Sequence, residues 1–220
     1  MKTRIKICGL TNEEDALAAA EAGADFLGFV FYPQSPRYVA PKQVHEIARR
    51  VRNSFPDGAP RPALVGVFVD DPADRVRGTL DFCGLDLAQL HGSEPPFELR
   101  SLAPRAYKAL RPQTRGDAEA FVATYQADLP DVPDMPQLLL DAYHPWVPGG
   151  IGEKADWHAG IVLARRFRVL LAGGLNPGNV AEAIATVCPW GVDVASGVER
   201  EPGKKDHRKV RDFVQAVRNT

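Results

Sequence analysis

The chain contains little cysteine. Its 220 residues include three, Cys8, Cys83 and Cys188, and none of these belongs to a CxxC pair. An odd number of widely spaced cysteines argues against a disulfide framework and offers no zinc-ligand spacing. Free thiols are typical of a reducing compartment. We therefore expect a cytoplasmic protein that holds no metal ion.

Long apolar runs and an excess of either charge are also missing. No apolar stretch approaches the ~18 residues of a membrane span, and the opening MKTRIKICGL lacks the apolar core of a secretory signal. Lys and Arg number 27 against 28 Asp and Glu, which gives a net charge of −1. This balance provides no general attraction to nucleic acid or to a membrane surface. We expect neither as a partner.

A dinucleotide-binding fingerprint is absent too, because the first apolar strand runs into Cys8-Gly9-Leu10 and not into GxGxxG. Short apolar strands alternate instead with helical patterns. The predicted strands cover 4–7, 25–31, 63–69, 86–90, 106–110, 137–141, 168–172 and 192–196. Eight such units favour one α/β domain over residues 1–220, a (β/α)8 TIM barrel, although such barrels typically take ~250 residues. A doubly wound open sheet is the alternative.

Two of the predicted helices carry start signals. Thr11 and Glu14 stand three residues apart, as in a capping box, ahead of an Ala-rich stretch. Asp71 followed by Pro72 is typical of an N-cap with proline in the first helical turn. Other helices are expected from Pro41 onward and around 95–103, 116–126, 157–166, 177–187 and 205–217.

In barrels of this type, active sites lie at the C-terminal ends of the strands. The polar residues expected at these ends are Cys8, Arg37, Asp70, His91, Lys108 or Arg111, and Asp141. Cys8 offers a thiolate base or nucleophile, but buried cysteine is also ordinary core filler. Asp141 ends an apolar run, where burial can raise its pKa and make it a general acid. Alternatively, it ties down the loop that follows.

The remaining single residues have two interpretations each. Arg37 can hold a substrate carboxylate or stand as a solvated charge. His91, in QLHG, is interpreted as a structural hydrogen-bonding histidine, with substrate contact as the alternative. Cys83 lies on an apolar helical stripe and Cys188 follows the last stripe residue of a helix, so both are predicted to be core.

Glycine-bearing loops indicate a phosphate site. Gly173-Gly174 and Ser196-Gly197 follow the last two predicted strands, where exposed backbone N–H groups of barrel enzymes bind phosphate. For one such loop a simple tight turn explains the glycines equally well, but two adjacent loops favour phosphate. A third glycine pair, Gly149-Gly150, lies in a long connection after the sixth strand, interpreted either as a lid or as a solvent loop.

Seven stretches, in order along nearly the whole chain, resemble the phosphoribosylanthranilate isomerase family of tryptophan biosynthesis: KICGLTNEEDA, GADFLGFVFYPQSPRYV, VGVFV, QLHG, LLLDA, LAGGLNPGNV and VDVASGVEREPGKKD. The resemblance implies a barrel enzyme, a monomer or a homodimer, with a small phosphosugar substrate. It implies an Amadori rearrangement of N-(5-phosphoribosyl)anthranilate to 1-(2-carboxyphenylamino)-1-deoxyribulose 5-phosphate, with no cofactor.

The resemblance also implies residue roles. The cysteine of the family's K-I-C-G is the general base and the aspartate ending its sixth strand the general acid, which correspond to Cys8 and Asp141. Arg37 is then expected to hold the anthranilate carboxylate, and Asp193 to lie near the anthranilate nitrogen. Gly9 is expected to leave room for the ribose. The implied phosphate site comprises Gly149, Gly150, Gly173, Gly174, Ser196 and Gly197.

The chain departs from the family pattern at two loop positions. Ile151 stands where the family often has threonine, and Ala195 replaces a frequent serine. We expect altered phosphate contacts and retained activity. Two other functions stay open at this point. A histidine-pathway isomerase would carry an aspartate in place of Cys8, and a non-catalytic phosphate-binding barrel would not need an acid and a base.

Overall fold

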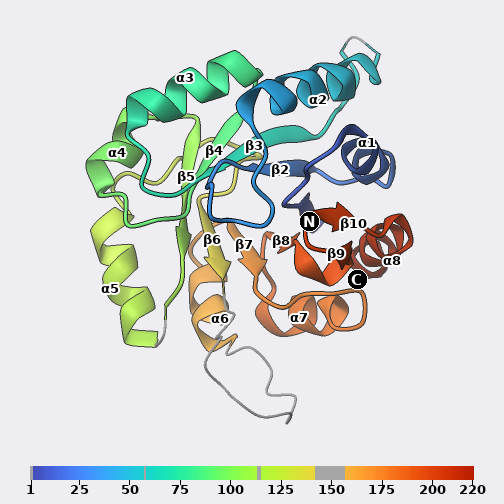
Figure 1. Ribbon diagram of the computed structural model, residues 1–220. Coiled ribbons are helices and arrows are strands. Elements are labelled where there is room, and N and C mark those ends of the chain that lie inside the picture. The colour runs from blue at the N-terminus through green and yellow to red at the C-terminus, as the bar shows by residue number, and fades with distance from the viewer. Residues whose placement is uncertain (1, 57, 113–114, 142–156) are drawn as a thin grey trace.

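The computed structural model describes residues 2–56, 58–112, 115–141 and 157–220, arranged as a barrel (Figure 1). Within these ranges eight parallel strands pair in chain order, and β8 pairs with β1 to close the sheet. They are β1 (Arg4–Ile7), β2 (Phe26–Val30), β3 (Ala63–Phe68), β4 (Leu87–Leu90), β5 (Ala106–Leu110), β6 (Leu138–Asp141), β7 (Val169–Ala172) and β8 (Gly191–Val194). The predicted TIM barrel is confirmed, and the doubly wound alternative is wrong because the sheet has no edge.

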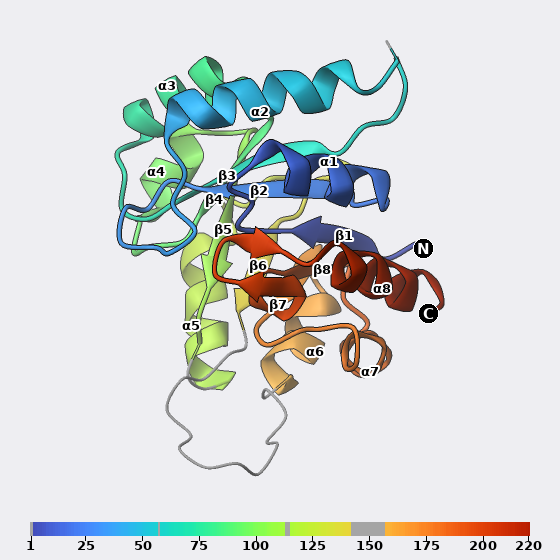
Figure 2. The same ribbon diagram turned by 45° about the vertical axis from the view of Figure 1, so that its right-hand side comes forward.

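Helices surround the strands on the outside of the barrel, as Figures 1 and 2 show from two directions. They are α1 (Glu13–Glu21), α2 (Pro41–Asn53), α3 (Ala73–Cys83), α4 (Pro96–Ser101), α5 (Arg115–Tyr125), α6 (His158–Ala164), α7 (Val180–Val187) and α8 (His207–Arg218). Among the described residues, no helix combines the length and the apolar character that crossing a membrane requires.

The core has two layers because successive strand residues point to opposite faces of the sheet. In β1, Ile5 and Ile7 are fully buried in the cluster between strands and helices. Lys6 and Cys8 alternate with them and point into the barrel, where Cys8 reaches the cavity at its mouth. A smaller apolar cluster that includes Phe26 fills the lower part of the lumen. The same alternation therefore packs the fold and supplies the site.

The first helix begins differently from its predicted capping box. Asn12, and not Thr11, is the N-cap: its side-chain oxygen accepts from the Asp15 backbone N–H at 2.8 Å, and its amide nitrogen donates to the Asp15 carboxylate at 2.8 Å. Thr11 instead donates its hydroxyl to the carbonyl of Gly203 at 2.5 Å. Thr11 does not cap the helix, because its hydroxyl is used in this contact with a residue distant in the sequence.

Two further predictions need correction. Helix α3 starts at Ala73 with Pro72 as its N-cap, so Asp71 does not cap it. The Ala73 N–H is satisfied by the carboxylate of Glu98 at 2.8 Å.

Cys83 is buried as predicted, but Cys188 is exposed. Cys188 ends α7 in a left-handed conformation with φ 51°, which turns its side chain out of the helix stripe.

A small element after β8 was not predicted. A 3₁₀ turn, Ser196–Val198, leads into a two-stranded antiparallel hairpin of β9 (Glu199–Glu201) and β10 (Lys204–Lys205). Figure 1 shows the hairpin beside α8. It brings Glu199 and Lys205, which are both buried, close to the loop after β2.

Candidate active site

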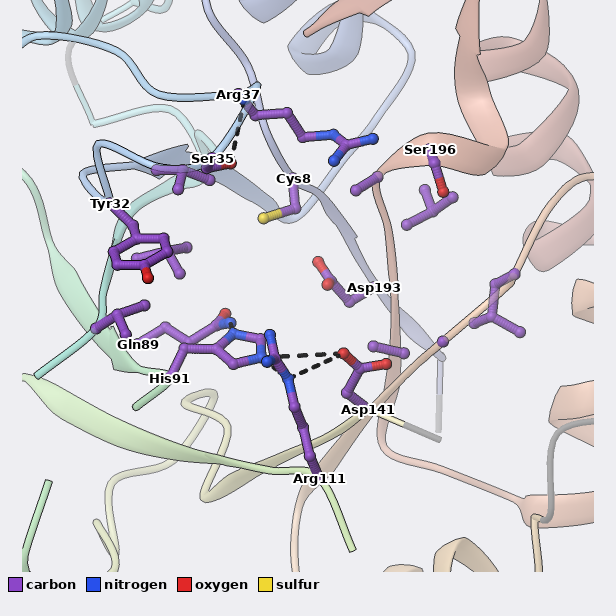
Figure 3. Close-up of a pocket in the computed structure, with 18 of the residues that line it drawn as sticks. Cys8, Tyr32, Ser35, Arg37, Gln89, His91, Arg111, Asp141, Asp193 and Ser196 are labelled. Carbon is purple, nitrogen blue, oxygen red and sulfur yellow. Dashed lines mark hydrogen bonds and ion pairs between the residues drawn. The ribbon is translucent and has the colours of Figure 1, made fainter. Parts of the chain in front are cut away.

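A cavity of about 460 Å³ opens where the barrel strands end. Residues distant in the sequence point into it, as Figure 3 shows. Eight residues predicted from the sequence line it: Cys8, Arg37, His91, Asp141, Gly173, Gly174, Asp193 and Ser196. Because this is the end of a barrel that carries chemistry, the cavity is the candidate active site.

The other predicted site residues lie elsewhere. Gly149 and Gly150 lie outside the described residues, as does Ile151. Gly197 is not part of the lining; a Cβ there would collide with the carbonyl oxygen of Leu175, so this glycine lets two neighbouring loops pack. Of the two candidates on strand five, Arg111 lines the cavity and Lys108 does not.

Cys8 lies at the base of the cavity and is 7% exposed. Its backbone N–H donates to the carbonyl of Val194 at 2.9 Å, which ties the end of β1 to the end of β8. Gly28 on β2 makes room for the thiol, since a Cβ there would lie 2.8 Å from the Cys8 sulfur. Burial raises the pKa of the Cys8 thiol above its ordinary value. A thiolate formed here is therefore a stronger base than an exposed one.

Directly below the cavity, Lys6 pairs with Asp193. The Lys6 Nζ donates to the Asp193 carboxylate at 2.9 Å, and the Lys6 side chain is fully buried. Burial alone would lower the pKa of Lys6, but the charge of Asp193 raises it above the ordinary value. The pair joins β1 to β8 and holds the Asp193 carboxylate at the floor of the site.

Asp141 faces the cavity from the end of β6, on the side away from Arg37 (Figure 3). Its Oδ2 lies 3.5 Å from the Arg111 Nε and 3.9 Å from the His91 Nε2. The Arg111 Nε–H donates to the same His91 nitrogen at 3.0 Å. Two side chains from the ends of β4 and β5 thus surround the carboxyl group.

His91 is a neutral imidazole. Burial, followed by the charges of Arg111, Lys6 and Lys108, lowers the pKa of His91 to about 3. Its Nδ1 lies 2.7 Å from the amide of Gln89, which in turn accepts from the Tyr107 hydroxyl at 2.9 Å. The prediction of a hydrogen-bonding histidine is confirmed, while substrate contact stays a prediction.

Arg37 is held by its partners and is not a solvated charge. Its Nε and Nη2 donate to the two carboxylate oxygens of Glu199 at 2.8 and 2.7 Å. This fork occupies one edge of the guanidinium and leaves Nη1 for a ligand. Gly9, with φ 74°, lies under the Arg37 stem, and a Cβ there would be 2.5 Å from Cδ. Gly9 therefore makes room for Arg37, which corrects the expectation that it makes room for the ribose.

The loops after β7 and β8 adjoin each other at one wall. Gly173 and Gly174 both have positive φ, 97° and 65°, conformations that glycine adopts without strain. Asn176 and Asn179 then brace the turn into α7, with the Asn179 side chain accepting from the Asn176 N–H at 2.8 Å. The wall presents backbone groups and the exposed Ser196, a lining suited to an anion.

The sequence reading did not single out Lys6, Gln89, Tyr107, Glu199 or Lys205. One signal was available for two of them, because Lys6 and Gln89 precede Cys8 and His91 by two residues and so share their face of the strand. A polar residue on the lumen face of an apolar strand is a candidate for the site floor. Glu199 and Lys205 gave no such signal, since the hairpin that buries them is visible only in the fold.

The chain matches known proteins over nearly its whole length. The family model described as "N-(5'phosphoribosyl)anthranilate (PRA) isomerase" matches residues 5–216, nearly the whole chain. The chain belongs to the PRA isomerase family. Among curated PRA isomerases, that of Geobacter sp. strain M21 is 49% identical over 96% of both chains. That of Pseudomonas fluorescens SBW25 is 45% identical over 99% of this chain and 96% of its own.

Solved PRA isomerase structures share the fold as well. The enzyme of Thermotoga maritima superposes with a TM-score of 0.84 at 39% identity, covering 99% of this chain and 100% of its own. A PRA isomerase complex with reduced 1-(o-carboxyphenylamino)-1-deoxyribulose 5-phosphate gives 0.81 at 37% identity, with the same coverage. Another structure shows monomers generated from the dimeric T. maritima enzyme. The family assignment favours PRA isomerase over the histidine-pathway isomerase.

Proposed function

We propose that the chain catalyses the Amadori rearrangement of N-(5'-phosphoribosyl)anthranilate in tryptophan biosynthesis, by general acid–base catalysis with Cys8 as base and Asp141 as acid. Membership of the PRA isomerase family supports the reaction. The observation that carries the residue assignment is the cavity itself, into which a buried thiol and a carboxyl point from different strands (Figure 3).

The acid acts first. Asp141 gives its proton to the furanose ring oxygen, the C1′–oxygen bond breaks, and the nitrogen lone pair forms a Schiff base with C1′. Asp141 is left as a carboxylate, close to Arg111. This cationic neighbour stabilises the conjugate base, as a positive charge does for a carboxylate.

The base acts second. The Cys8 thiolate removes the proton from C2′, and the electrons of that bond move toward the nitrogen to give an enolamine. In the final tautomerisation the Cys8 thiol gives its proton to C1′, the 2′-hydroxyl loses its proton to form the ketone, and that proton replaces the one that Asp141 gave up. The buried position of Cys8 supports this role, since desolvation makes its thiolate more basic.

Three groups would orient the substrate between acid and base. Arg37 directs to the anthranilate carboxylate the edge of its guanidinium that Glu199 does not hold, and Asp193 lies near the nitrogen. His91, neutral and fixed by Gln89, contacts the substrate beside Asp141. The phosphate rests against the loops after β7 and β8, at Gly173, Gly174 and Ser196. Phosphate contacts of Gly149 and Gly150, which lie outside the described residues, stay a prediction. We propose that the protein is a monomer or a homodimer. Light scattering of the purified protein gives its molar mass in solution and distinguishes the two.

The test follows the loss of substrate fluorescence with wild-type protein and with Cys8→Ala and Asp141→Asn. General acid–base groups contribute roughly 10²–10⁴-fold each, so each variant is expected to lose at least that much kcat. A Cys8→Ala variant with near-normal turnover would remove the base from the proposal. The imidazole-pathway substrate serves as a parallel assay, and turnover of neither substrate by the wild type contradicts the function.

A further inference from the structure

Lys6 stands directly below Cys8 on the same face of β1. Its side chain is fully buried in the lumen of the barrel. A lysine loses its hydration at such a position, and most sequences avoid that cost by placing an apolar residue there. The partner Asp193 compensates part of this loss. The question is what a buried ammonium provides that a leucine does not.

The geometry around Gly28 shows where the ammonium points. A Cβ on Gly28 would lie 3.1 Å from the Lys6 Nζ and 2.8 Å from the Cys8 sulfur. The cation and the sulfur therefore flank one small space on the lumen side of β2, a space that stays open only because residue 28 has no side chain. Any larger residue would push them apart.

We propose that Lys6 is a positioning residue that acts through Cys8: its buried ammonium faces the sulfur and stabilises the thiolate that removes the substrate proton. The inference rests on the proposed function insofar as Cys8 is the base. The pairing with Asp193 favours the charged form of Lys6 and raises the pKa of its ammonium group. Lys6 is therefore a fixed charge and does not itself exchange a proton.

Other charged groups also face the Cys8 sulfur and together determine the direction in which the pKa of its thiol shifts. Asp193 on β8 opposes ionisation of Cys8, as burial does, whereas Lys6 and Lys205 on β10 favour it. Arg37, from the loop after β2, and the Tyr107 hydroxyl on β5 also interact with the thiolate charge. Burial prevails and the pKa of Cys8 is raised. Without Lys6, Asp193 would face the sulfur uncompensated and the pKa of Cys8 would rise further.

A purely structural role for Lys6 is the competing explanation, because the ion pair also joins β1 to β8. The two explanations differ in what happens to the thiol. A structural lysine affects stability only, whereas a charge acting on Cys8 changes the pH at which its thiolate forms. Measuring the thiol itself separates them without any use of substrate.

The experiment measures the rate of iodoacetamide alkylation at Cys8 from pH 7 to 11, with the modified peptide identified by mass spectrometry. An opposite charge within ~4–6 Å shifts a pKa by roughly 1–3 units. Lys6→Met is therefore expected to raise the Cys8 pKa by at least about one unit, and to slow its alkylation about 10-fold at pH 8. Lys6→Arg keeps the charge and is expected to restore most of the rate.

The matched control is Lys108→Met, which removes the other fully buried lysine in the barrel wall, a residue paired with Glu94 and outside the cavity. It is expected to leave the alkylation profile of Cys8 unchanged. If Lys6→Met does not fold, Lys6→Gln replaces it, because the amide is neutral and can still donate to Asp193. Equal Cys8 profiles in wild type and in the folded neutral variant overturn the proposal.

The pH dependence of kcat/KM then separates this inference from the function on which it rests. If the thiol pKa and the rising limb of the kcat/KM profile move together in Lys6→Met, Lys6 acts through Cys8 in catalysis. If the thiol pKa moves while the kcat/KM profile stays in place, Lys6 still tunes the thiol, but Cys8 is not the base. That second result refutes the catalytic part of the proposal.

Discussion

Two buried lysines of this barrel have the same chemistry and different surroundings. Lys6 pairs with Asp193 at 2.9 Å, and Lys108 pairs with Glu94 at 2.8 Å. The Lys6 pair points into the lumen, beneath the cavity. The Lys108 pair points outward and is covered by α5, with the ammonium 5.8 Å from the ring centres of Phe121 and Tyr125.

The difference lies in how each cation is satisfied. Besides Glu94, the Lys108 ammonium donates to the carbonyl groups of Leu90, Gly92 and Ala109 at 3.2, 2.7 and 3.4 Å, so its donors are used by fixed acceptors around it. Burial nonetheless lowers the pKa of Lys108. Lys6 has Asp193 and the neighbourhood of the Cys8 sulfur. A cation whose donors are used up holds a loop in place, whereas one with capacity left can act on a reactive group.

The largest effect is expected on stability, from a substitution that breaks the outward-pointing Lys108–Glu94 pair. Removing one partner of a buried ion pair leaves the other uncompensated and typically costs ~3–5 kcal/mol. Lys108→Met is therefore expected to lower the free energy of unfolding by about that much, and Tm by roughly 10 °C for a chain of this size. Denaturant and thermal unfolding measure the loss.

The same variant is expected to keep kcat within about threefold of wild type at 25 °C, because no reacting group moves. A collapse of kcat at temperatures where Lys108→Met is still folded would show that the Lys108–Glu94 pair affects catalysis and not stability alone. Lys6→Met, assayed beside it, is also expected to lose stability because it breaks a buried ion pair, but to show in addition the greater loss in kcat/KM.

A third buried carboxylate, that of Glu199, combines features of the structural pair at Lys108 and of the site pair at Lys6. Glu199 accepts from Lys205 at 2.8 Å, like a structural pair, and also holds both donors on one edge of Arg37. Glu199→Gln weakens this charge-assisted fork, which is worth about 1.5–3 kcal/mol. We expect KM to rise about 10-fold with little change in kcat, since the role proposed for Arg37 is to orient the substrate and not to react.

Steady-state kinetics of Glu199→Gln give both constants. Glu201→Gln provides the control, because Glu201 lies on the same hairpin and its ion pair among the described residues is with Lys204 at the surface. A fall in kcat with unchanged KM would assign Glu199 to the chemistry and not to substrate orientation.

The smallest expected effect concerns His91, whose pKa both lysines lower. Its folded-state pKa of about 3 lies below the ordinary 6.5, so the unfolded chain binds the proton more readily between these values. Its contribution to stability is thus complete above pH 6.5 and is lost as the pH falls toward 3. From pH 7 to 5.5 the loss is about 1 kcal/mol.

Denaturant unfolding of wild type and His91→Gln at the two pH values measures this difference, since glutamine has no proton to gain. An equal loss in both proteins would mean that other groups cause the acid sensitivity. In addition, kcat/KM is expected to show no histidine inflection between pH 5 and 8 and to rise toward alkaline pH as Cys8 ionises.

The sequence predicted the fold well because its signals are local. Apolar strands, helical stripes and the glycine turns are each visible within a dozen residues, and their strict alternation leaves few topologies. The errors occurred where a distant group overrode a local preference. Thr11 bonds to Gly203 and leaves the cap to Asn12, and the hairpin from Glu199 to Lys205 has no strong strand pattern of its own.

The same distinction holds for the site: residues with a local signal were predicted, and roles that depend on distant contacts were not. The strand-end rule and the family resemblance placed Cys8, Asp141 and Arg37 at the mouth of the barrel, and all three line one cavity. The roles of Gly9 and Gly197 were not predictable, because each depends on what packs against it: the Arg37 stem in one case and the Leu175 carbonyl in the other.

By itself, the sequence determined the order of strands and helices, the family, and which thiol, carboxyl and guanidinium groups stand at strand ends. The tertiary structure decided which charges share a buried space. That Lys6 pairs with Asp193 and faces Cys8, that Glu199 holds Arg37, and that His91 is neutral all depend on contacts between residues far apart in the chain. Burial and Coulomb interactions act over distances in space, which the sequence fixes only once the barrel has closed.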